Sequence, residues 1–344
     1  MRARLEAALQ RSWWRPAPDA LAWGLWPLSL GYRGLLALHL RRTTWPLALP
    51  VPVLVVGNHV VGGAGKTPTV IATVQALQAA GHRPGVISRG HGRDGGAVLS
   101  VSDAASAAAV GDEPLLIRRR CGVPVWVGRQ RAEVALALCA AHPDVDVLVA
   151  DDGLQHRALA RQAELVVFDE RGAGNGLLLP AGPLREPLPA SVPKQRRVLY
   201  TAGRASTALP GVMAARHLTL AWPLDAWHRG DARQAVPLSH LQGRPLLAAA
   251  GLAAPAKFFT MLQHAGLQAS ALPLPDHHPY TTLPWPPATA DVLVTEKDAV
   301  KLLPARMGTT RVWVLPLDLA LPPGLIDELC GLLFPSHPVP HATP

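Results

Sequence analysis

Short apolar runs recur along the first part of the chain, and each is followed by a polar or glycine-containing stretch. Short runs rich in Val, Leu and Ile predict buried strands, and the longer segments between them predict helices. The expected strands are 51–56, 84–88, 124–127, 145–150, 165–168 and 198–201, and the expected helices are 69–80, 115–120 and 129–141. This alternation predicts an α/β fold with a doubly wound, mainly parallel sheet.

A second alternation of strands and helices begins beyond residue 201. Its expected strands are 246–250, 291–295 and 312–315, and its expected helices are 256–265, 299–303 and 325–334. This pattern predicts a second, smaller α/β domain. We therefore divide the chain into an N-terminal segment (1–45), a main domain (46–200), a smaller domain (201–334) and a flexible, proline-rich tail (335–344).

The turn after the first predicted strand is rich in glycine and leads into a helix that begins near Lys66. Glycines let backbone N–H groups approach phosphate oxygens, and the positive helix N-terminus stabilises the bound anion. Lys66 can reach the terminal phosphates of a nucleotide, and Thr67 can bind Mg²⁺. The expected nucleotide-binding residues are Val60, Val61, Gly62, Gly63, Ala64, Gly65, Lys66 and Thr67.

This loop departs from the common phosphate-loop pattern at one position, because Val60 stands where the first glycine is usual. The alternative is an ordinary glycine-rich turn between a strand and a helix. The sequence G-K-T directly after a hydrophobic strand favours the phosphate loop, and with it a nucleotide and Mg²⁺ as cofactors.

Pairs of acidic residues lie at two of the predicted element ends. Asp151 and Asp152 follow the strand 145–150, where a phosphate-loop enzyme needs a carboxylate for Mg²⁺. The sequence Asp-Asp-Gly is also common in turns, but the predicted phosphate loop at 60–67 favours the interpretation that these carboxylates bind metal. Asp112 and Glu113 precede a predicted helix. Their spacing alone favours the simpler interpretation that both carboxylates only interact with the positive end of the helix dipole.

Other polar residues carry weaker signals. Arg89 and Arg93 lie in a glycine-rich loop at the carboxyl end of a predicted strand, where they could meet phosphate or be solvated. The adjacent His277 and His278 are weak evidence for a metal site, since no third ligand is near. The long Gly/Pro-rich stretch that ends at Pro189 is more typical of a functional segment than of an idle loop.

The N-terminal segment is basic, then apolar and rich in Trp. Its uncharged part, Ala20–Tyr32, is too short to span a bilayer, which needs about twenty residues, and Pro27 would kink a helix there. Such a segment suits the interface of a membrane. The alternative is a helix packed on its own domain.

Composition narrows the class of partner. With 33 Lys and Arg against 24 Asp and Glu, the net charge is +9 and the pI is about 10.2, which favours anionic partners. No long basic tract with interleaved aromatic residues is present, so nucleic acid is disfavoured. The three cysteines are far apart and lack metal-ligand spacing, as expected of reduced thiols in the cytosol.

Taken together, the motifs resemble one family, the tetraacyldisaccharide 4′-kinases, which are the lipid A 4′-kinases of Gram-negative bacteria. The matching pieces, in the family's order, are V-G-N-H-V-V-G-G-A-G-K-T-P (56–68), S-R-G-H-G-R (88–93), G-D-E-P (111–114), A-D-D-G-L-Q-H (150–156), L-P-A-G-P-L-R-E-P (179–187), D-H-H-P-Y (276–280) and V-T-E-K-D-A-V-K-L (294–302). Each motif is weak alone, but the set is specific. Val60 and Asn58 fit the variant loop of this family.

The resemblance implies transfer of the γ-phosphate of ATP to the 4′-hydroxyl of an acylated disaccharide 1-phosphate lipid, to give lipid IVA. It implies ATP and Mg²⁺ as cofactors, and a place at the cytoplasmic face of the bacterial inner membrane, held there by the N-terminal segment. We expect the enzyme to be a monomer.

The resemblance also implies roles for single residues. Asp112 is the expected general base, and a histidine of the D-H-H motif, His277 in preference to His278, orients it from the smaller domain. Closure of a cleft between the domains would then complete this pair. Lys66 and Arg185 are expected near the transferred phosphate. The expected metal ligands are Thr67, Asp151, Asp152 and Glu113.

Two other classes of protein compete with this interpretation. A membrane-associated switch or partitioning ATPase has a loop that begins K-G-G, but here Val61 takes the place of that signature lysine. A structural nucleotide-binding module would need no Asp112. Dependence of ATP turnover on an acylated disaccharide separates the kinase from both.

Overall fold

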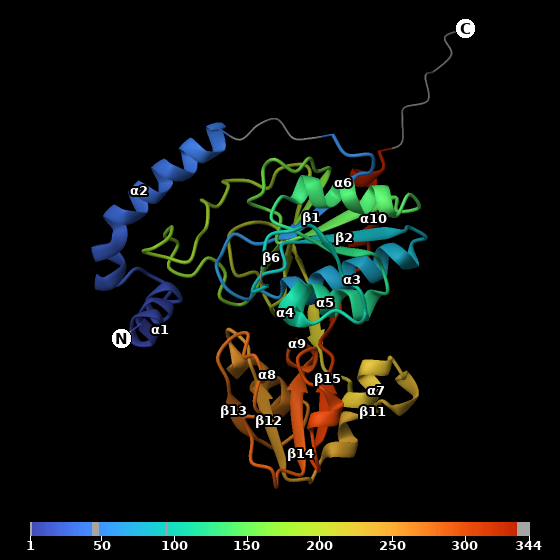
Figure 1. The fold of residues 1–344 in the computed structure, drawn as a ribbon. Coiled ribbons are helices and arrows are strands. Elements are labelled where there is room, and N and C mark those ends of the chain that lie inside the picture. The colour runs from blue at the N-terminus through green and yellow to red at the C-terminus, as the bar shows by residue number, and fades with distance from the viewer. Residues whose placement is uncertain (1, 43–47, 94, 336–344) are drawn as a thin grey trace. The chain divides into compact units, whose positions relative to one another are not determined.

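The computed structural model describes residues 2–42, 48–93 and 95–335 and shows two compact units, each built from separate stretches of the chain (Figure 1). The first unit comprises the described residues of 1–87, 131–214 and 321–344. The second comprises those of 88–130 and 215–320. Residues 336–344, most of the predicted tail, lie outside the described residues, as do residues 43–45 of the predicted N-terminal segment.

The first unit is organised around a parallel sheet with the strand order β2-β5-β1-β6-β7-β8. Its strands are β1 (Val53–Gly57), β2 (Pro84–Ser88), β5 (Val147–Asp151), β6 (Ala163–Phe168), β7 (Arg196–Tyr200) and β8 (Val212–Met213). Every residue of β1, β2, β5 and β6 is buried, as expected of parallel strands covered on both faces. The chain leaves β1 and β5 at the same edge of the sheet, because Val56 is paired with Asp151.

The helices among the described residues of this unit are α1 (Arg2–Trp13), α2 (Ala20–Arg42), α3 (Lys66–Ala79), α6 (Arg131–Ala141) and α10 (Leu325–Leu333). Helix α10 comes from the end of the chain and contacts α3, β1 and β6. It therefore completes the first unit and not the second.

The second unit contains a six-stranded sheet with the order β11-β10-β15-β14-β12-β13. Its strands are β10 (Leu220–Pro223), β11 (Val236–Pro237), β12 (Leu246–Ala250), β13 (Ala269–Pro273), β14 (Asp291–Thr295) and β15 (Arg311–Leu315). Strands β13, β12, β14 and β15 are parallel, and β10 is antiparallel to β15. Two further antiparallel pairs are β3 (Leu99–Ser100) with β4 (Val125–Val127), and β9 (Ala215–His217) with β16 (Asp318–Ala320).

The helices of the second unit are short. They are α4 (Ala107–Val110), α5 (Asp112–Cys121), α7 (Leu224–Arg229), α8 (Pro255–His264), α9 (Glu296–Ala299) and three 3₁₀ turns (Ala232–Gln234, Leu238–Leu241 and Pro304–Arg306). Helix α5 packs against α9. Residues 88–130, which the sequence pattern places in the main domain, thus belong to the same unit as residues 215–320.

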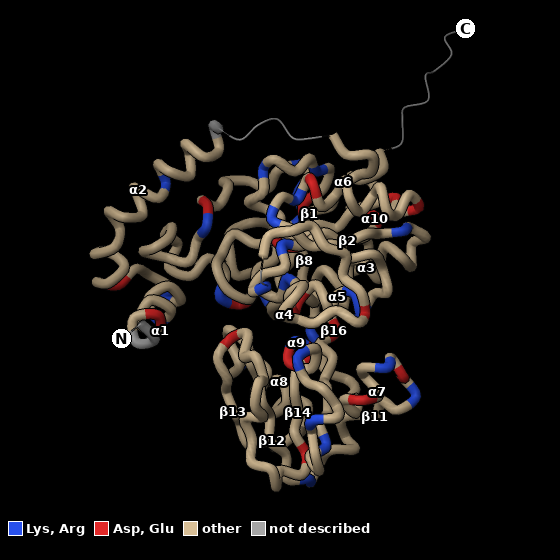
Figure 2. Tube along the Cα trace, viewed as in Figure 1, with Lys and Arg blue, Asp and Glu red and all other residues tan. Residues whose placement is uncertain are grey.

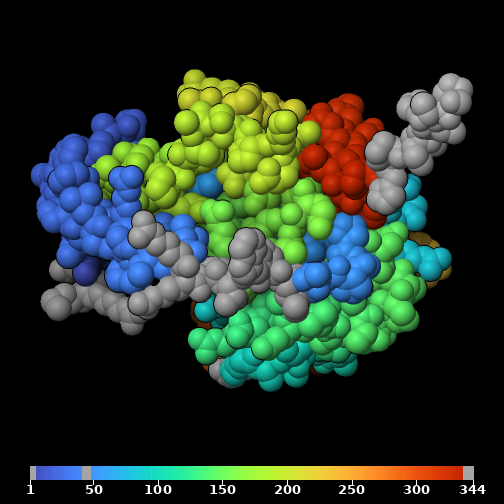
Figure 3. Space-filling view, turned by 90° about the horizontal axis from the view of Figure 1, so that it is seen from above, coloured from blue at the N-terminus to red at the C-terminus, as the bar shows by residue number. Residues whose placement is uncertain are grey.

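One side of helix α2 is hydrogen-bonded to the rest of the first unit. The Ser29 hydroxyl donates a hydrogen bond to Leu178 O (2.9 Å), and the Tyr32 hydroxyl donates one to Arg185 O (2.7 Å). Figure 3 shows the blue N-terminal residues against the yellow-green segment that contains these acceptors. Pro27, where the sequence predicts a kink, lies inside α2, and the helix continues beyond it to Arg42.

The rest of the described α2 surface is mostly apolar and exposed, and Arg33 and His39 are polar exceptions on it. Its exposed large side chains are Leu21, Trp23, Trp26, Leu28, Leu30, Leu35, Leu38 and Leu40. Figure 2 shows little charge along the described part of the helix. Among the described residues, no helix combines the length and hydropathy that a crossing of the bilayer requires.

Candidate active site

The glycine-rich loop between β1 and α3 is shaped for an anion. Gly62 and Gly65 have φ angles of 84° and 85°, in the left-handed region that glycine adopts without steric cost. Gly65 is the N-cap of α3, and the first turn of this helix contains no acidic residue. The positive end of the helix dipole is therefore not neutralised by a carboxylate of the helix itself, so the loop can bind phosphate.

The loop is held by the segment that contains L-R-E-P. Val61 N donates a hydrogen bond to Pro183 O (2.9 Å), and Val60 forms a β-bridge with Leu184. The Val60 side chain is fully buried in a cluster with Ala64 and Leu184. This packing explains why a valine takes the place of the usual first glycine, since its side chain anchors the loop.

Lys66, Asp152 and Arg185 form a charged group beside the loop. Lys66 Nζ lies 3.2 Å from Asn58 Oδ1 and 3.5 Å from Asp152 Oδ1. Arg185 Nη1 donates to both oxygens of Asp152, at 2.9 and 3.1 Å. Burial raises the pKa of Asp152, but the charges of Lys66 and Arg185 lower that pKa by more, so the carboxylate stays ionised.

The oxygen ligands expected for Mg²⁺ in this unit lie at neighbouring element ends. Thr67 is in the first turn of α3, and Asp151, 2% exposed, ends β5 beside the end of β1. Nowhere in the described parts of the chain do three His, Cys, Asp or Glu side chains gather as a ready-made metal site. Mg²⁺ in kinases is held by one or two carboxylates with phosphate oxygens and water, so this donor set fits it.

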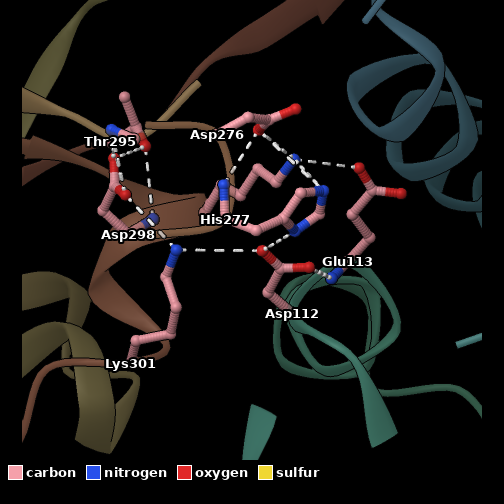
Figure 4. Close-up of polar contacts among 9 residues, drawn as sticks. Asp112, Glu113, Asp276, His277, Thr295, Asp298 and Lys301 are labelled. Carbon is pink, nitrogen blue, oxygen red and sulfur yellow. Dashed lines mark hydrogen bonds and ion pairs between the residues drawn. The ribbon is translucent and has the colours of Figure 1, made fainter. Parts of the chain in front are cut away.

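In the second unit, Asp112 and His277 are in direct contact (Figure 4). His277 Nδ1 lies 2.9 Å from Asp112 Oδ2, although the two residues are 165 positions apart in the sequence. The sequence pattern places them in different domains. In the structure both residues belong to the second unit, so the contact between them forms within that unit alone.

Local backbone geometry presents both side chains. Gly111 has a φ angle of 94°, and a Cβ atom there would lie 3.1 Å from the Gly90 Cα atom. A glycine is therefore needed for the sharp turn into α5, whose first residue is Asp112. His277 itself has a φ angle of 57°, and its backbone N–H donates to Asp276 Oδ1 (3.1 Å). The neighbouring His278 ring instead packs on Tyr280, with the ring centres 4.8 Å apart.

Asp112 is 3% exposed and nevertheless favours the ionised form. Burial raises its pKa, but the hydrogen bond from His277 and the charges of Lys297, His277 and Lys301 lower this pKa by more. The hydrogen bond with Asp112 raises the pKa of His277, against the opposing effects of burial and Lys297. A buried carboxylate in contact with a histidine is an arrangement that can take a proton from a hydroxyl group.

Comparison with known proteins shows the family of the chain. The family model described as tetraacyldisaccharide-1-P 4′-kinase matches residues 21–333. The chain belongs to this family. The tetraacyldisaccharide 4′-kinase of Leptothrix cholodnii is 52% identical over 97% of this chain and 98% of its own length, and that of Methylibium petroleiphilum is 51% identical over 98% and 96%.

A solved structure agrees with this membership. The crystal structure of LpxK from Aquifex aeolicus in complex with ATP has a TM-score of 0.73 to this chain and is 26% identical to it, and the match covers 91% of this chain and all of that one. The predictions of an α/β fold of the phosphate-loop type, of kinase activity in lipid A biosynthesis and of ATP as a cofactor are confirmed.

Two lysines of the second unit, Lys297 and Lys301, were not singled out from the sequence. Lys297 Nζ lies 3.3 Å from each of Glu113 Oε1, Asp276 Oδ1 and His277 Nε2, and Lys301 Nζ lies 3.8 Å from Asp112 Oδ2. Both belong to the V-T-E-K-D-A-V-K-L motif. Charged residues directly after a buried strand were the available signal, because ligands bind at the carboxyl ends of strands in open α/β sheets.

Proposed function

We propose that this chain transfers the γ-phosphate of ATP to the 4′-hydroxyl of a tetraacyldisaccharide 1-phosphate, with Asp112 as the general base. The observation that carries the proposal is the contact of the buried Asp112 carboxylate with His277 at 2.9 Å. Asp112 takes the hydroxyl proton while the 4′ oxygen forms a bond to the γ-phosphorus. The bond from that phosphorus to the bridging oxygen of ADP breaks, and its electron pair leaves with ADP.

In this proposal the first unit binds and neutralises the phosphates. Backbone N–H groups of residues 60–67 would hold the β- and γ-phosphates, and Lys66 would stabilise the charge that spreads over the transferred group. Arg185 and Lys66 both contact Asp152, Arg185 at 2.9 Å and Lys66 at 3.5 Å. Arg185 would therefore add a second positive charge beside the transferred phosphate. Both cations are fixed in advance by Asp152, so little reorganisation is needed during transfer.

Magnesium is the metal we propose for the reaction. Its proposed ligands are Thr67, Asp151, Asp152 and Glu113. When bound, Mg²⁺ neutralises phosphate charge and polarises the γ-phosphate. These oxygen donors match its preference for hard ligands.

We further propose that the enzyme works at the cytoplasmic face of the inner membrane through α2. Exposed Trp and Leu side chains cover this helix, while Ser29 and Tyr32 bind it to the first unit. Such a helix can lie in the membrane interface beside a multi-acyl substrate. Every group in the proposed reaction comes from this one chain, so a monomer is sufficient.

The experiment that tests the proposal follows labelled γ-phosphate from Mg·ATP to tetraacyldisaccharide 1-phosphate in detergent micelles. We expect Asp112→Asn to lower kcat by about 10²–10⁴-fold, the usual contribution of a general base, with little change in the KM for ATP. Lys66→Ala should abolish transfer as well. Asp103→Asn is the matched control, because Asp103 is an exposed acid of the same unit that pairs with Arg118.

Two results would contradict the proposal. Full activity of Asp112→Asn would remove the base from the mechanism. ATP hydrolysis that is stimulated by anionic vesicles, without any labelled lipid, would instead identify a switch ATPase.

A further inference from the structure

An arginine that the proposed reaction does not use holds the backbone of the phosphate loop. Arg171 Nη2 donates a hydrogen bond to Gly63 O at 2.6 Å, although the two residues are 108 positions apart in the sequence. Among the described residues, a Cβ atom at Gly62 or Gly63 would meet nothing within 4 Å. Side-chain packing therefore does not fix this part of the loop, and the hydrogen bond from Arg171 does.

The direction of the Gly63 carbonyl group matters because a carbonyl oxygen repels phosphate. In a planar trans peptide, the C=O of Gly63 and the N–H of Ala64 point in opposite directions. Glycine rotates its peptide units at little steric cost, so an unheld unit could turn its oxygen toward the nucleotide. The hydrogen bond keeps this oxygen on the side of Arg171 and the N–H on the opposite side.

A carboxylate and an aromatic ring hold Arg171 in place. Asp169, 1% exposed and directly after β6, accepts a hydrogen bond from Arg171 Nε at 2.9 Å and lies 2.7 Å from Nη2. The Arg171 guanidinium also lies over the ring of Trp14, with Cζ 4.0 Å from the ring centre. Because Asp169 balances the charge of Arg171, the arginine acts through the direction of its donors more than through net charge.

Trp14 connects the N-terminal segment to this contact. Its partly buried side chain packs against the apolar cluster that anchors the phosphate loop. The preceding residue is fixed to the same unit, because Trp13 Nε1 donates to Pro180 O (2.8 Å) and Trp13 O accepts from Asn175 N (2.8 Å). The end of α1 therefore supports the loop, in addition to leading into the apolar helix α2.

We propose that Arg171 is a positioning residue for the phosphate loop, which fixes the Gly63 carbonyl group while Trp14 holds the guanidinium in place. This inference rests on the proposed binding of ATP phosphates by residues 60–67. It requires no contact between Arg171 and the nucleotide. It also gives the N-terminal segment a role in ATP binding that needs no membrane.

Calorimetric titration of the full chain with Mg·ATP, in the absence of any lipid acceptor, tests the role of Arg171. Arg171→Met should weaken ATP binding about tenfold, the effect of losing a hydrogen bond made by a charged group. Arg171→Lys should weaken it as well, because an ammonium group lacks the planar fork that stacks on a ring and binds two acceptors together. Arg83→Met is the matched control, since Arg83 is an exposed arginine of the same unit.

A second variant keeps the test valid if the loss of Arg171 alone destabilises the fold. The double variant Asp169→Asn/Arg171→Met removes the buried carboxylate together with its cation, and its ATP binding should be as weak as that of Arg171→Met. In the labelled-phosphate assay, both variants should raise the KM for ATP about tenfold with kcat nearly unchanged, because saturating ATP holds the loop in its bound conformation.

A double-mutant cycle tests the role of Trp14. Trp14→Ala should weaken ATP binding, and Trp14→Phe should restore most of it, since a phenyl ring also binds a guanidinium through its face. In the Arg171→Met background, Trp14→Ala should have no further effect, because both side chains act through the same contact. Additive effects of the two substitutions would overturn the role of Trp14.

Wild-type ATP affinity in Arg171→Met or in the double variant would overturn the inference, and wild-type affinity in Arg171→Lys would show attraction by charge alone. A loss of kcat with an unchanged KM would also overturn it, because that pattern indicates a merely structural arginine. Lys66→Ala separates this inference from the proposed function. Unchanged ATP binding in Lys66→Ala refutes the proposed phosphate site, whereas weaker binding there with wild-type binding in Arg171→Met refutes the inference alone.

Discussion

At the scale of single residues, Glu186 connects the L-R-E-P segment to the start of the phosphate loop. Its carboxylate accepts hydrogen bonds from Gln155 Nε2 (3.0 Å) and Arg157 Nη2 (2.9 Å) and lies 3.3 Å from His59 Nδ1. Gln155 Nε2 also donates to Asn58 O at 3.0 Å. Arg185 is the preceding residue, so these contacts also fix the position of the cation that binds Asp152.

Glu186 should make the stability of the enzyme depend on acid pH. Burial raises its pKa, but hydrogen bonds from His59 and Gln155 and the charge of Arg157 lower this pKa by more, from 4.5 to about 2. Its contribution is therefore present above pH 4.5 and is lost as the pH falls through about 2. A shift of this size corresponds to at most about 3 kcal/mol of unfolding free energy.

Urea unfolding at a series of pH values measures this contribution. In Glu186→Gln, the free energy of unfolding should fall less steeply between pH 5 and pH 2 than in the wild-type enzyme. Glu6→Gln is the control, because Glu6 is exposed on α1. Equal slopes for Glu186→Gln and the wild type would show that the pKa of Glu186 is not lowered on folding.

At the scale of elements, the short helix α9 contains Lys297, and Lys301 follows directly after its C-cap residue, Val300. Thr295 is its N-cap: the hydroxyl accepts from Asp298 N at 3.3 Å and donates to Asp298 Oδ2 at 2.7 Å. Asp298 is fully buried and also accepts from Gly251 N at 3.1 Å. A four-residue helix has too few internal hydrogen bonds to be stable alone, so these side-chain bonds determine its position.

We expect Thr295→Val to destabilise the enzyme and to lower its turnover. Loss of an N-cap costs about 1 kcal/mol, and the reduced kcat would follow from displacement of Lys297. Urea unfolding and the labelled-phosphate assay measure the two effects. Thr309→Val, at an exposed position of the same unit, should change neither, and a Thr295→Val enzyme with wild-type stability would contradict the capping role.

Several strands of the structure could be predicted from the sequence, whereas the start of α9 and the contact between Asp112 and His277 could not. The strands at 51–56, 145–150 and 291–295 were predictable, because each is an apolar run bounded by turn or charged residues, and they match β1, β5 and β14. Helix α9 begins at Glu296, ahead of the predicted helix at 299–303, since its start is fixed by the Thr295 cap and not by apolar spacing. The contact between Asp112 and His277 has no local signal, and only the family resemblance indicated it.

At the scale of the whole molecule, α2 gives the first unit an apolar surface. Trp23 and Trp26 are 56% and 41% exposed, and their rings pack edge to face with centres 6.2 Å apart. Large apolar side chains that are exposed together are typical of a site of membrane or protein contact. For a kinase whose family acts on an acylated disaccharide, the membrane is the partner that we propose.

Vesicle sedimentation tests this surface. Burial of two such side chains in lipid contributes about 3 kcal/mol, so the double variant Trp23→Ser/Trp26→Ser should bind vesicles of anionic phospholipid on the order of 100-fold more weakly. The double variant Leu136→Ser/Leu303→Ser removes exposed leucines that are not part of α2 and should bind as the wild type does. Equal weakening by both pairs would show that binding is not specific to α2.

The division of the chain between the two units affects how the protein folds during its synthesis. The chain leaves the first unit at residue 87, returns at residue 131, leaves again at residue 214 and returns at residue 321. A ribosome releases His277 long after Asp112, and α10 after both. Domains usually fold as units as they emerge, but here neither unit has all its parts until late. Nascent chains should therefore expose β1 and α3, the surfaces that α10 covers, and a chain that ends before α10 should depend on chaperones and be prone to aggregation.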